Sequence, residues 1–472
     1  MNVEQAIYVK PSERQLNWQA LEFYGFIHFG MNTFTNTEWG HGHENPELFN
    51  PTTIDCDQWI RSFKAAGMKG AILTCKHHDG FCLWPSRQTE HSVAATQWKG
   101  GQGDVVAEFV EACRRQDMQA GFYLSPWDMT EETYGMGKPY DDFFVAQLEE
   151  LLTNYGEVFE LWFDGANGEG PNGKRQVYDW SRYYEVIRRL QPNAVISVCG
   201  PDVRWIGNEG GDVRENEWSV VPIELRDAEK TAEISQQNVI DPFLTQLKST
   251  NLDLGSRETL KEYEGELVWY PAEVDVSIRP GWFYHPEEDN QVRSLENLWK
   301  LYKNSVGGNA SLLLNVPPTP KGTIHELDVK VLSQLGDKIS AFKETNQLFQ
   351  SKINFSSNAS KLTEKAILNM ERESGYWQPD STEQAPVIEI TFDQPTLINA
   401  LVISEAIELG QHVEELVISG KINGEWQLLK ETGSIGFKQI IEFSPTELEG
   451  LKLKFTQYRG FLAINYLQAL NI

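Results

Sequence analysis

The sequence predicts an α/β fold, a (β/α)8-like barrel followed by a C-terminal antiparallel β-sandwich. Short apolar runs alternate with segments of helical periodicity over the first ~340 residues, which is typical of a parallel α/β protein. No glycine-rich phosphate-binding loop follows the first run, and this disfavours a nucleotide-binding doubly wound sheet. Beyond about residue 345 the runs are short and alternating, with turn residues between them. A chain of 472 residues is too long for one ordinary domain, so we expect a barrel over 1–343 and a β-sandwich over 344–472.

The predicted barrel strands are short apolar runs that are rich in aromatic and β-branched residues. Seven such runs are visible: Tyr24–Gly30, Gly70–Cys75, Ala120–Ser125, Val158–Asp164, Ala194–Cys199, Glu266–Ala272 and Ser311–Val316. Helices are expected at Asp104–Asp117, which opens with a good N-cap, and at Asp141–Tyr155, Tyr178–Leu190 and Val292–Val306. The region 201–265 is irregular, so the sixth strand cannot be placed.

The predicted C-terminal part begins with a polar segment rich in Ser and Asn, Asn346–Ala359, which we interpret as a linker. Six strand-like runs follow: Val387–Phe392, Ala400–Ser404, Glu415–Ser419, Trp426–Lys430, Gln439–Phe443 and Leu451–Gln457. Asn423-Gly424 is a typical hairpin turn between two of them. Thirteen of the 15 tryptophans and eight of the nine histidines lie before residue 326, so we expect the chemistry in the barrel.

Composition excludes several classes of function. The formal net charge of −27 and the pI of about 4.8 argue against binding nucleic acid and favour a neutral ligand. No apolar run approaches the roughly 20 residues that cross a membrane, and no secretory signal is visible at the N-terminus. Five cysteines without a Cys-x-x-Cys pair predict reduced thiols in a cytoplasmic protein.

Asp164 is the strongest candidate for chemistry, because it ends an aromatic strand, Val158–Asp164, and is followed by Gly165. A carboxylate at the tip of a buried strand is costly unless a function or a partner holds it there, and active sites of α/β barrels form at such tips. A turn aspartate is the competing interpretation, since Asp-Gly is a common turn pair.

Polar and aromatic residues also gather at the carboxyl ends of the other predicted strands and just beyond them. They are His28, Glu38, Trp39, His77, His78, Asp79, Tyr123, Ser125 and Trp127. Imidazole, carboxylate and indole groups form directional hydrogen bonds to hydroxyls, and aromatic faces cover the C–H face of a sugar ring. The pattern therefore favours a sugar ligand, with buried structural histidines as the alternative.

A metal site is the competing interpretation of His77, His78 and Asp79, and His28 could join them. Adjacent residues of an extended strand point to opposite sides, so His77 and His78 are not expected to bind one ion. The sequence has no His-Glu-x-x-His motif either. We therefore expect no metal.

Hydrolysis of a glycoside needs a second carboxyl group opposite the first. Glu209 lies in a glycine-flanked loop near Trp205, and Glu217 is the second choice, with a solvated surface position as the alternative for each. In a further cluster, Arg279 could anchor loops or a carboxylate, and Trp282 and Tyr284 could form an apolar wall.

Three segments together resemble glycoside hydrolase family 29, the α-L-fucosidases. They are Gly25–Gly30 with Glu38-Trp39, Lys76–Phe81, and Leu161–Gly165, and the similarity covers about residues 8–340. The resemblance implies a retaining exo-α-L-fucosidase in which Asp164 is the nucleophile. It also implies a fucose pocket formed by His28, Glu38, Trp39, His77, His78 and Tyr123, with Trp282 facing the fucose methyl group.

The loop Gly207-Asn208-Glu209 is similar to the branch of this family that cleaves α-1,3- and α-1,4-linked fucose from Lewis-type glycans. This similarity implies that Glu209 is the acid/base, with Glu217 as the backup. It further implies a fucosylated oligosaccharide as substrate and no cofactor. With the cytoplasmic composition, it predicts a bacterial enzyme acting on imported oligosaccharides.

Alternatives remain open at this point. One is a broad-specificity α-L-fucosidase that includes α-1,2 linkages, and another is a non-catalytic fucose-binding protein. A metal-dependent hydrolase using the histidines is the third. Trp377 and Trp426 of the β-sandwich could bind sugar, but a structural brace is favoured. The composition does not predict an oligomeric state.

Overall fold

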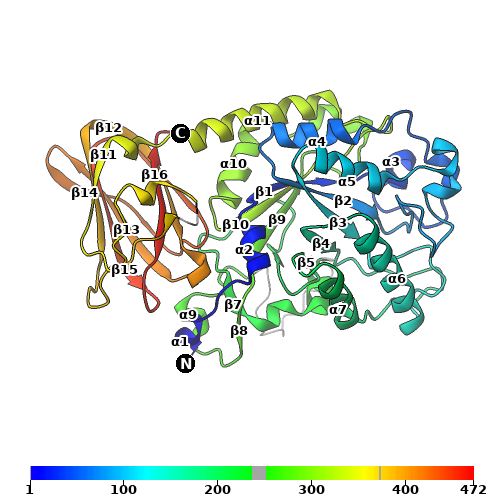
Figure 1. The fold of residues 1–472 in the computed structure, drawn as a ribbon, viewed down its shortest axis with the longest axis horizontal. Coiled ribbons are helices and arrows are strands. Elements are labelled where there is room, and N and C mark those ends of the chain that lie inside the picture. Colours follow the sequence, from blue (N-terminus) through cyan, green and yellow to red (C-terminus); the bar gives the residue numbers. More distant parts are fainter. Residues whose placement is uncertain (1, 236–250, 372–373) are drawn as a thin grey trace.

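The computed structural model describes residues 2–235, 251–371 and 374–472. Its larger part is a nearly closed barrel of eight parallel strands, as predicted (Figure 1). The strands neighbour one another in the order β5-β4-β3-β2-β1-β10-β9-β6, and a parallel bridge between Ser197 and Val203 links the two ends of the sheet. They are β1 Phe23–Ile27, β2 Gly70–Lys76, β3 Gln119–Leu124, β4 Glu160–Phe163, β5 Val195–Val198, β6 Arg204–Trp205, β9 Ala272–Ser277 and β10 Ala310–Asn315.

Helices surround the barrel, and their amphipathic stripes explain why (Figure 1). In α5, Asp104 caps the first turn by accepting a hydrogen bond from the backbone N–H of Ala107, and residues such as Phe109 are fully buried. The helices are α1 Asn2–Ala6, α2 Glu13–Gln19, α3 Met31–Thr35, α4 Cys56–Ala65, α5 Val105–Arg115, α6 Lys138–Asn154, α7 Trp180–Leu190, α8 Ala228–Ser235, α9 Arg257–Leu260, α10 Leu295–Ser305 and α11 Glu326–Glu344.

One predicted barrel strand is wrong. The apolar run Glu266–Ala272 contains β8, Leu267–Trp269, which pairs with β7, Val220–Pro222, in a separate two-stranded sheet. The barrel strand is the next segment, β9, which reads Ala-Glu-Val-Asp-Val-Ser. Its acidic residues interrupt the apolar pattern by which the other strands were predicted, yet Glu273 and Asp275 are both buried. The sixth strand, which could not be placed from the sequence, is β6, whose two residues are too few for periodicity to reveal. Residues 236–250 of the irregular region lie outside the described residues.

The C-terminal part is one antiparallel sheet of six strands. Its strands are β11 Ser351–Phe355, β12 Val387–Glu405, β13 Val413–Ile422, β14 Glu425–Thr432, β15 Gln439–Tyr458 and β16 Ile464–Leu470. Strand β12 joins two of the predicted runs into one long strand, and β15 joins two others. Register shifts interrupt the hydrogen-bond ladder between β12 and β15. The predicted linker Asn346–Ala359 is wrong, because it contains β11, whose alternating Ile353 and Phe355 face the core of this sheet.

The two faces of β12 explain how the C-terminal sheet attaches to the barrel. Leu401 and Ile403 belong to the core of the C-terminal sheet, whereas Ala400 and Val402 belong to the core that includes the barrel. This alternation follows from the period of two residues in a strand. Helix α11 runs along one side of the molecule and leads from the barrel to the C-terminal sheet (Figure 1).

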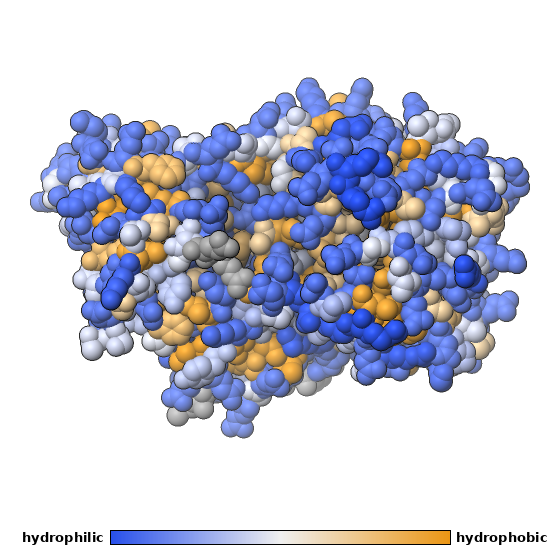
Figure 2. Space-filling model, in the orientation of Figure 1, coloured by the Kyte–Doolittle hydropathy of each residue, from blue (hydrophilic) through white to orange (hydrophobic). Residues whose placement is uncertain are grey.

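Polar residues cover much of the surface (Figure 2). Figure 2 shows a face covered mainly by hydrophilic residues, with smaller apolar areas between them. Within the described residues, no helix has the length and apolar character needed to cross a membrane. All five cysteines are buried and free of disulfide bonds.

Candidate active site

The predicted site residues gather around one cavity of about 370 Å³ at the carboxyl ends of the barrel strands. Eight of the ten predicted residues line it: His28, Glu38, Trp39, His77, His78, Asp164, Glu209 and Trp282. Tyr123 lies just behind the wall, where its hydroxyl donates a hydrogen bond to Asp164. Glu217 is the exception. A cavity of this size, with mixed polar and aromatic walls, suits a small sugar.

Asp164 follows β4 directly and is held by two hydrogen bonds. Its Oδ2 accepts from the hydroxyl of Tyr123 at 2.9 Å, and its Oδ1 accepts from the backbone N–H of Ala166 at 2.8 Å. The second hydrogen bond closes the turn that the Asp-Gly pair predicts. In this one conformation Asp164 forms a turn and also lines the cavity, so its structural and catalytic interpretations do not exclude each other. Tyr123, on β3, is fully buried and stacks on Trp162 of the neighbouring strand β4.

Three histidines form one wall of the cavity, and burial lowers the pKa of each. The pKa of His28 falls to about 3, and those of His77 and His78 also lie below the ordinary value. These imidazoles are therefore neutral near pH 7. His28 shares a contact of 2.9 Å between its Nδ1 and Oδ1 of Asn315, which orients the ring.

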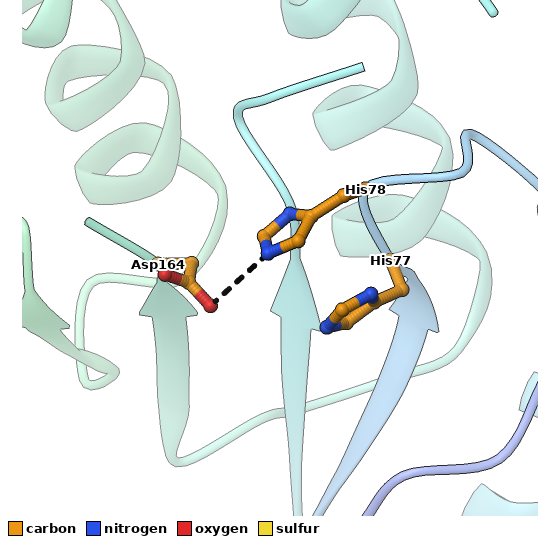
Figure 3. A group of neighbouring side chains, drawn as sticks. All are labelled: His77, His78 and Asp164. Atoms are coloured by element: carbon orange, nitrogen blue, oxygen red, sulfur yellow. Dashed lines mark ion pairs between the residues drawn. The ribbon is translucent and has the colours of Figure 1, made fainter. Parts of the chain in front are cut away.

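The expectation that His77 and His78 point to opposite sides is wrong. Strand β2 ends at Lys76, so the alternation of an extended strand no longer applies at the two histidines. Their ring centroids are 4.1 Å apart, and both rings face the region of Asp164 (Figure 3). One ligand atom from each of these three residues lies within 4.8 Å of the others, so the trio has the spacing of a candidate metal site.

Glu38 lines the cavity and also joins two loops. Its carboxylate accepts hydrogen bonds from the backbone N–H groups of Trp282 at 2.9 Å and Phe283 at 3.1 Å. Its Oε1 also lies 2.6 Å from Nε2 of His285, a residue whose supporting role was not predicted. Glu38 therefore positions Trp282, which lies against His28 with ring centroids 5.2 Å apart.

Trp39 stands at the mouth of the cavity. It is 56% exposed, and its ring meets the edges of His78 and Trp127. An exposed indole at a cavity mouth offers an apolar surface to a ligand that extends outward.

Glu209 reaches the cavity from the loop after β6, where the side chain of Asn208 holds the turn. Oδ1 of Asn208 accepts from the backbone N–H groups of Gly210 at 3.1 Å and Asp212 at 3.0 Å. Although Glu209 stands exposed at the rim, the surrounding protein desolvates its carboxyl group and raises its pKa, and the charge of Asp164 adds to this. A raised pKa keeps a carboxyl group protonated at higher pH, as a general acid requires.

Glu217 does not reach the cavity. It is 2% exposed and forms ion pairs with Arg204 and with Arg214, the latter at 2.7 Å. Both carboxylate oxygens are occupied by guanidinium groups, so the geometry removes Glu217 from the candidate acid/base residues. The sequence could not reveal this, because Arg204 is 13 residues away and lies on β6.

The cluster around Arg279 is structural. Arg279 is buried and binds Asp328 through Nε at 2.9 Å and Asp289 at 2.8 Å. It therefore anchors loops, which is one of the two roles predicted for it from the sequence. Tyr284 packs on the Arg279 guanidinium and donates to Asp289, which places it outside the cavity wall. Asp79 is also buried outside the wall, and burial raises its pKa to about 8.

Several wall residues were not predicted, namely Phe26, Trp162, Val198, Trp205 and Asp275. Trp162 stands two residues before Asp164 on the same strand, so the period of two residues could have placed it on the same side. Asp275 accepts a hydrogen bond from Nε1 of Trp205 at 2.8 Å, and burial raises its pKa well above the ordinary value. It was missed because β9 was missed.

A parallel barrel with two carboxyl groups, neutral imidazoles and indole rings around one cavity is the arrangement expected of a glycoside hydrolase. The family model for α-L-fucosidases matches residues 7–344. The chain is 38% identical to "Alpha-L-fucosidase 1" of Arabidopsis thaliana, over 97% of this chain and 86% of that protein. The chain therefore belongs to the α-L-fucosidase family and is a glycoside hydrolase.

Solved structures agree with this assignment. A Ruminococcus gnavus glycoside hydrolase 29 fucosidase, solved in complex with fucose, has 30% sequence identity and a TM-score of 0.84, covering 98% of this chain and 95% of that one. A glycoside hydrolase 29 family member from a rumen bacterium has 36% identity and a TM-score of 0.79, covering 98% and 77%. The alternative of a non-catalytic binding protein is therefore set aside.

Proposed function

We propose that this α-L-fucosidase is a retaining exo-enzyme that releases α-1,3- and α-1,4-linked fucose from Lewis-type oligosaccharides. The observation that carries the proposal is the pairing of Asp164 with Glu209 across one cavity, where the charge of Asp164 helps to raise the pKa of Glu209. One carboxylate is thereby available to attack while the other carboxyl group holds a proton, which is the division of roles that a retaining mechanism needs.

In the proposed mechanism, Asp164 attacks the anomeric carbon of fucose while Glu209 protonates the departing glycosidic oxygen. The resulting fucosyl-enzyme is hydrolysed by a water molecule that Glu209 deprotonates, and the anomeric configuration is retained. The Tyr123 hydroxyl orients the attacking carboxylate through its 2.9 Å hydrogen bond. No cofactor takes part in these steps.

The fucose pocket in this proposal consists of His28, Glu38, Trp39, His77, His78 and Trp282, with Tyr123 behind it. Neutral imidazoles can both donate to and accept from sugar hydroxyls, and Trp282 offers an aromatic face for the fucose methyl group. The exposed ring of Trp39 then lies where the rest of the oligosaccharide leaves the cavity.

Two experiments test the reaction. Proton NMR of the first-formed fucose reports its anomeric configuration, and a β-anomer as the first product would remove the retaining mechanism. A slow 2-deoxy-2-fluoro-fucoside should label Asp164, and peptide mass spectrometry would locate the label. Labelling of another carboxylate would displace Asp164 as nucleophile.

The linkage preference is tested with a panel of substrates. Lewis a and Lewis x trisaccharides should be cleaved much faster than 2′-fucosyllactose or an aryl α-L-fucoside. Equal rates on 2′-fucosyllactose would favour the broad-specificity alternative. The loop around Glu209 supports the narrower preference only through its similarity to that branch of the family.

We further propose that residues 344–472 brace the barrel (residues 1–343) and do not bind sugar. The side-chain amide of Gln411 donates to the backbone carbonyl of Glu217 at 3.1 Å and accepts from the N–H of Ser219 at 2.8 Å, which ties the C-terminal sheet to the segment after the Glu209 loop. Trp377 is fully buried in the core of the sheet, and Lys452 covers the ring of Trp426 at 4.0 Å. A titration of the protein with a fucosylated glycan should therefore give one glycan-binding site per chain.

We retain the prediction of a bacterial, cytoplasmic enzyme; the five buried free thiols support the cytoplasmic location. Fractionation of the native host is the test. Recovery of the protein outside the cytoplasm would contradict it.

A further inference from the structure

One wall of the cavity brings together three potential metal ligands, His77, His78 and Asp164. One ligand atom of each lies within 4.8 Å of the others, and Nε2 of His78 is 3.7 Å from Oδ2 of Asp164 (Figure 3). This separation is too long for a hydrogen bond. The two atoms face each other with no direct bond between them.

The hydrogen bonds of His78 determine which of its nitrogens carries the proton. The hydroxyl of Ser125 lies 2.6 Å from the backbone carbonyl oxygen of Trp127, and a carbonyl can only accept, so Ser125 donates there. Nδ1 of His78 lies 2.7 Å from the same hydroxyl oxygen and must therefore donate to it. Nε2 of the neutral ring consequently carries a lone pair.

A lone pair on Nε2 thus faces a carboxylate oxygen. Two acceptors at this distance attract a group that carries positive charge, such as a hydroxyl proton or a metal ion.

His77 supplies the third ligand. Its ring has no hydrogen bond to any of the described residues, and its Nδ1 is buried without a partner. The ring lines the cavity beside His78. A neutral imidazole that is free of internal hydrogen bonds is available to a metal ion.

We propose that His77, His78 and Asp164 bind a divalent transition-metal ion such as zinc, which inhibits the enzyme in competition with fucose. The competition rests on the proposed function, whereas the binding does not. A tetrahedral zinc ion separates its nitrogen and oxygen ligands by about 3.4 Å, close to the observed 3.7 Å. Three protein ligands and one open position are typical of zinc sites that exchange a water molecule.

Zinc binding removes a lone pair from the proposed nucleophile and fills the space between the imidazoles and the carboxylate. The carboxylate of Glu38, which also lines the cavity, favours a cation further. Imidazole ligands select zinc, nickel or copper over magnesium and calcium. Magnesium is therefore the matched negative probe.

Calorimetric titration of the chelator-treated full chain with zinc chloride measures the binding directly. We expect one zinc ion per chain, affinity that falls in the presence of fucose, and little binding of magnesium. His77→Gln and His78→Gln should each weaken zinc at least about tenfold, because each removes one of three ligands. The control is the double variant His41→Ala/His43→Ala, which removes the exposed histidine pair whose ring centroids are 6.2 Å apart and should change nothing.

Two outcomes overturn the proposal. The first is a zinc affinity that is unchanged in His77→Gln and His78→Gln but lost in the His41→Ala/His43→Ala control. The second is a zinc affinity that does not change when fucose is added. Asp164→Asn, which keeps the side-chain shape, serves as a third ligand variant if a histidine variant unfolds. Cobalt in place of zinc gives a visible absorption band for a tetrahedral site without any assay of activity.

Activity is measured separately. In the active enzyme, the inhibition constant for zinc should equal its calorimetric dissociation constant, with competitive kinetics. Turnover without zinc binding would refute the metal site and leave the proposed function intact. Zinc binding without turnover of any fucoside would refute the proposed function and leave the metal site intact.

Discussion

Replacing Glu217 by alanine leaves two buried guanidinium groups without their carboxylate. The pair with Arg204 is almost fully buried, with side-chain exposures of 2% and 1%, and Arg214 is 7% exposed. Nε and one terminal nitrogen of Arg204 already lack partners among the described residues. Loss of Glu217 would leave the Arg204 side chain with only a long contact of 3.4 Å to the backbone carbonyl of Trp218.

Breaking a buried ion pair by removing one partner costs about 3–5 kcal/mol, because the other charge remains buried. With an unfolding entropy of about 2.1 cal/mol/K per residue over a barrel-sized unit, this lowers the melting temperature by roughly 4–7 °C. The catalytic rate constant of the folded fraction should stay close to that of the wild type.

Glu209→Ala should behave in the opposite way. Glu209 is exposed at the rim and forms no ion pair with the described residues, so the melting temperature should hardly change. Loss of a general acid/base lowers turnover by about 10²–10⁴-fold. Sodium azide should restore turnover of an activated fucoside and yield a fucosyl azide.

The assay combines thermal unfolding by circular dichroism with fucose release from Lewis x trisaccharide. Glu217→Gln is the milder companion, since the amide keeps the shape of the side chain and part of its hydrogen bonding. A Glu217→Ala enzyme that melts like the wild type, is inactive and is rescued by azide would refute the assignment and return the acid/base role to Glu217.

The remaining predictions concern the same cavity and its supports. Asp164→Gly should abolish turnover while the melting curve is preserved, and wild-type activity in this variant would remove Asp164 from the mechanism. Asn208→Ala should lower the rate constant about tenfold or more by loosening the turn that carries Glu209, with little change in stability. Since the charge of Glu38 contributes to the raised pKa of Glu209, Glu38→Gln should lower that pKa and move the alkaline limb of the rate profile to lower pH; an upward shift would contradict this. Gln411→Ala, in the loop between β12 and β13, should lower the melting temperature with little change in the rate constant, because it removes the hydrogen bonds to Glu217 and Ser219; an unchanged melting temperature would weaken the brace interpretation.

The pattern of apolar runs predicted most barrel strands to within a few residues, since a strand buried on both faces is apolar along its whole length. This rule failed at β9, because Glu273 and Asp275 point into the interior. There they are held by hydrogen bonds from Nε1 of Trp162 at 2.7 Å and Nε1 of Trp205 at 2.8 Å, partners that lie far away in the chain. Buried acids supported by distant indoles cannot be distinguished from surface acids in one sequence.

The candidate site was predicted in a comparable way. Asp164 and the histidines stand at or just beyond the carboxyl ends of predicted strands, and these ends meet at one end of a barrel, so local order along the chain was enough to place them together. The choice between Glu209 and Glu217 was left open by the sequence, because both carboxylates occupy an irregular loop region beside tryptophans. Only the tertiary structure brings Arg204 and Arg214 onto Glu217.

The sequence by itself determined the alternation of strands and helices, the position of Asp164 and the acidic, sugar-compatible composition, since these depend on local periodicity and on residue type. The tertiary structure decided which carboxyl group reaches the cavity, that His77 and His78 face the same side beyond the end of β2, and which residues hold them there. The physical reason is that ion pairing, burial and side-chain direction beyond a strand end depend on contacts between segments far apart in the chain.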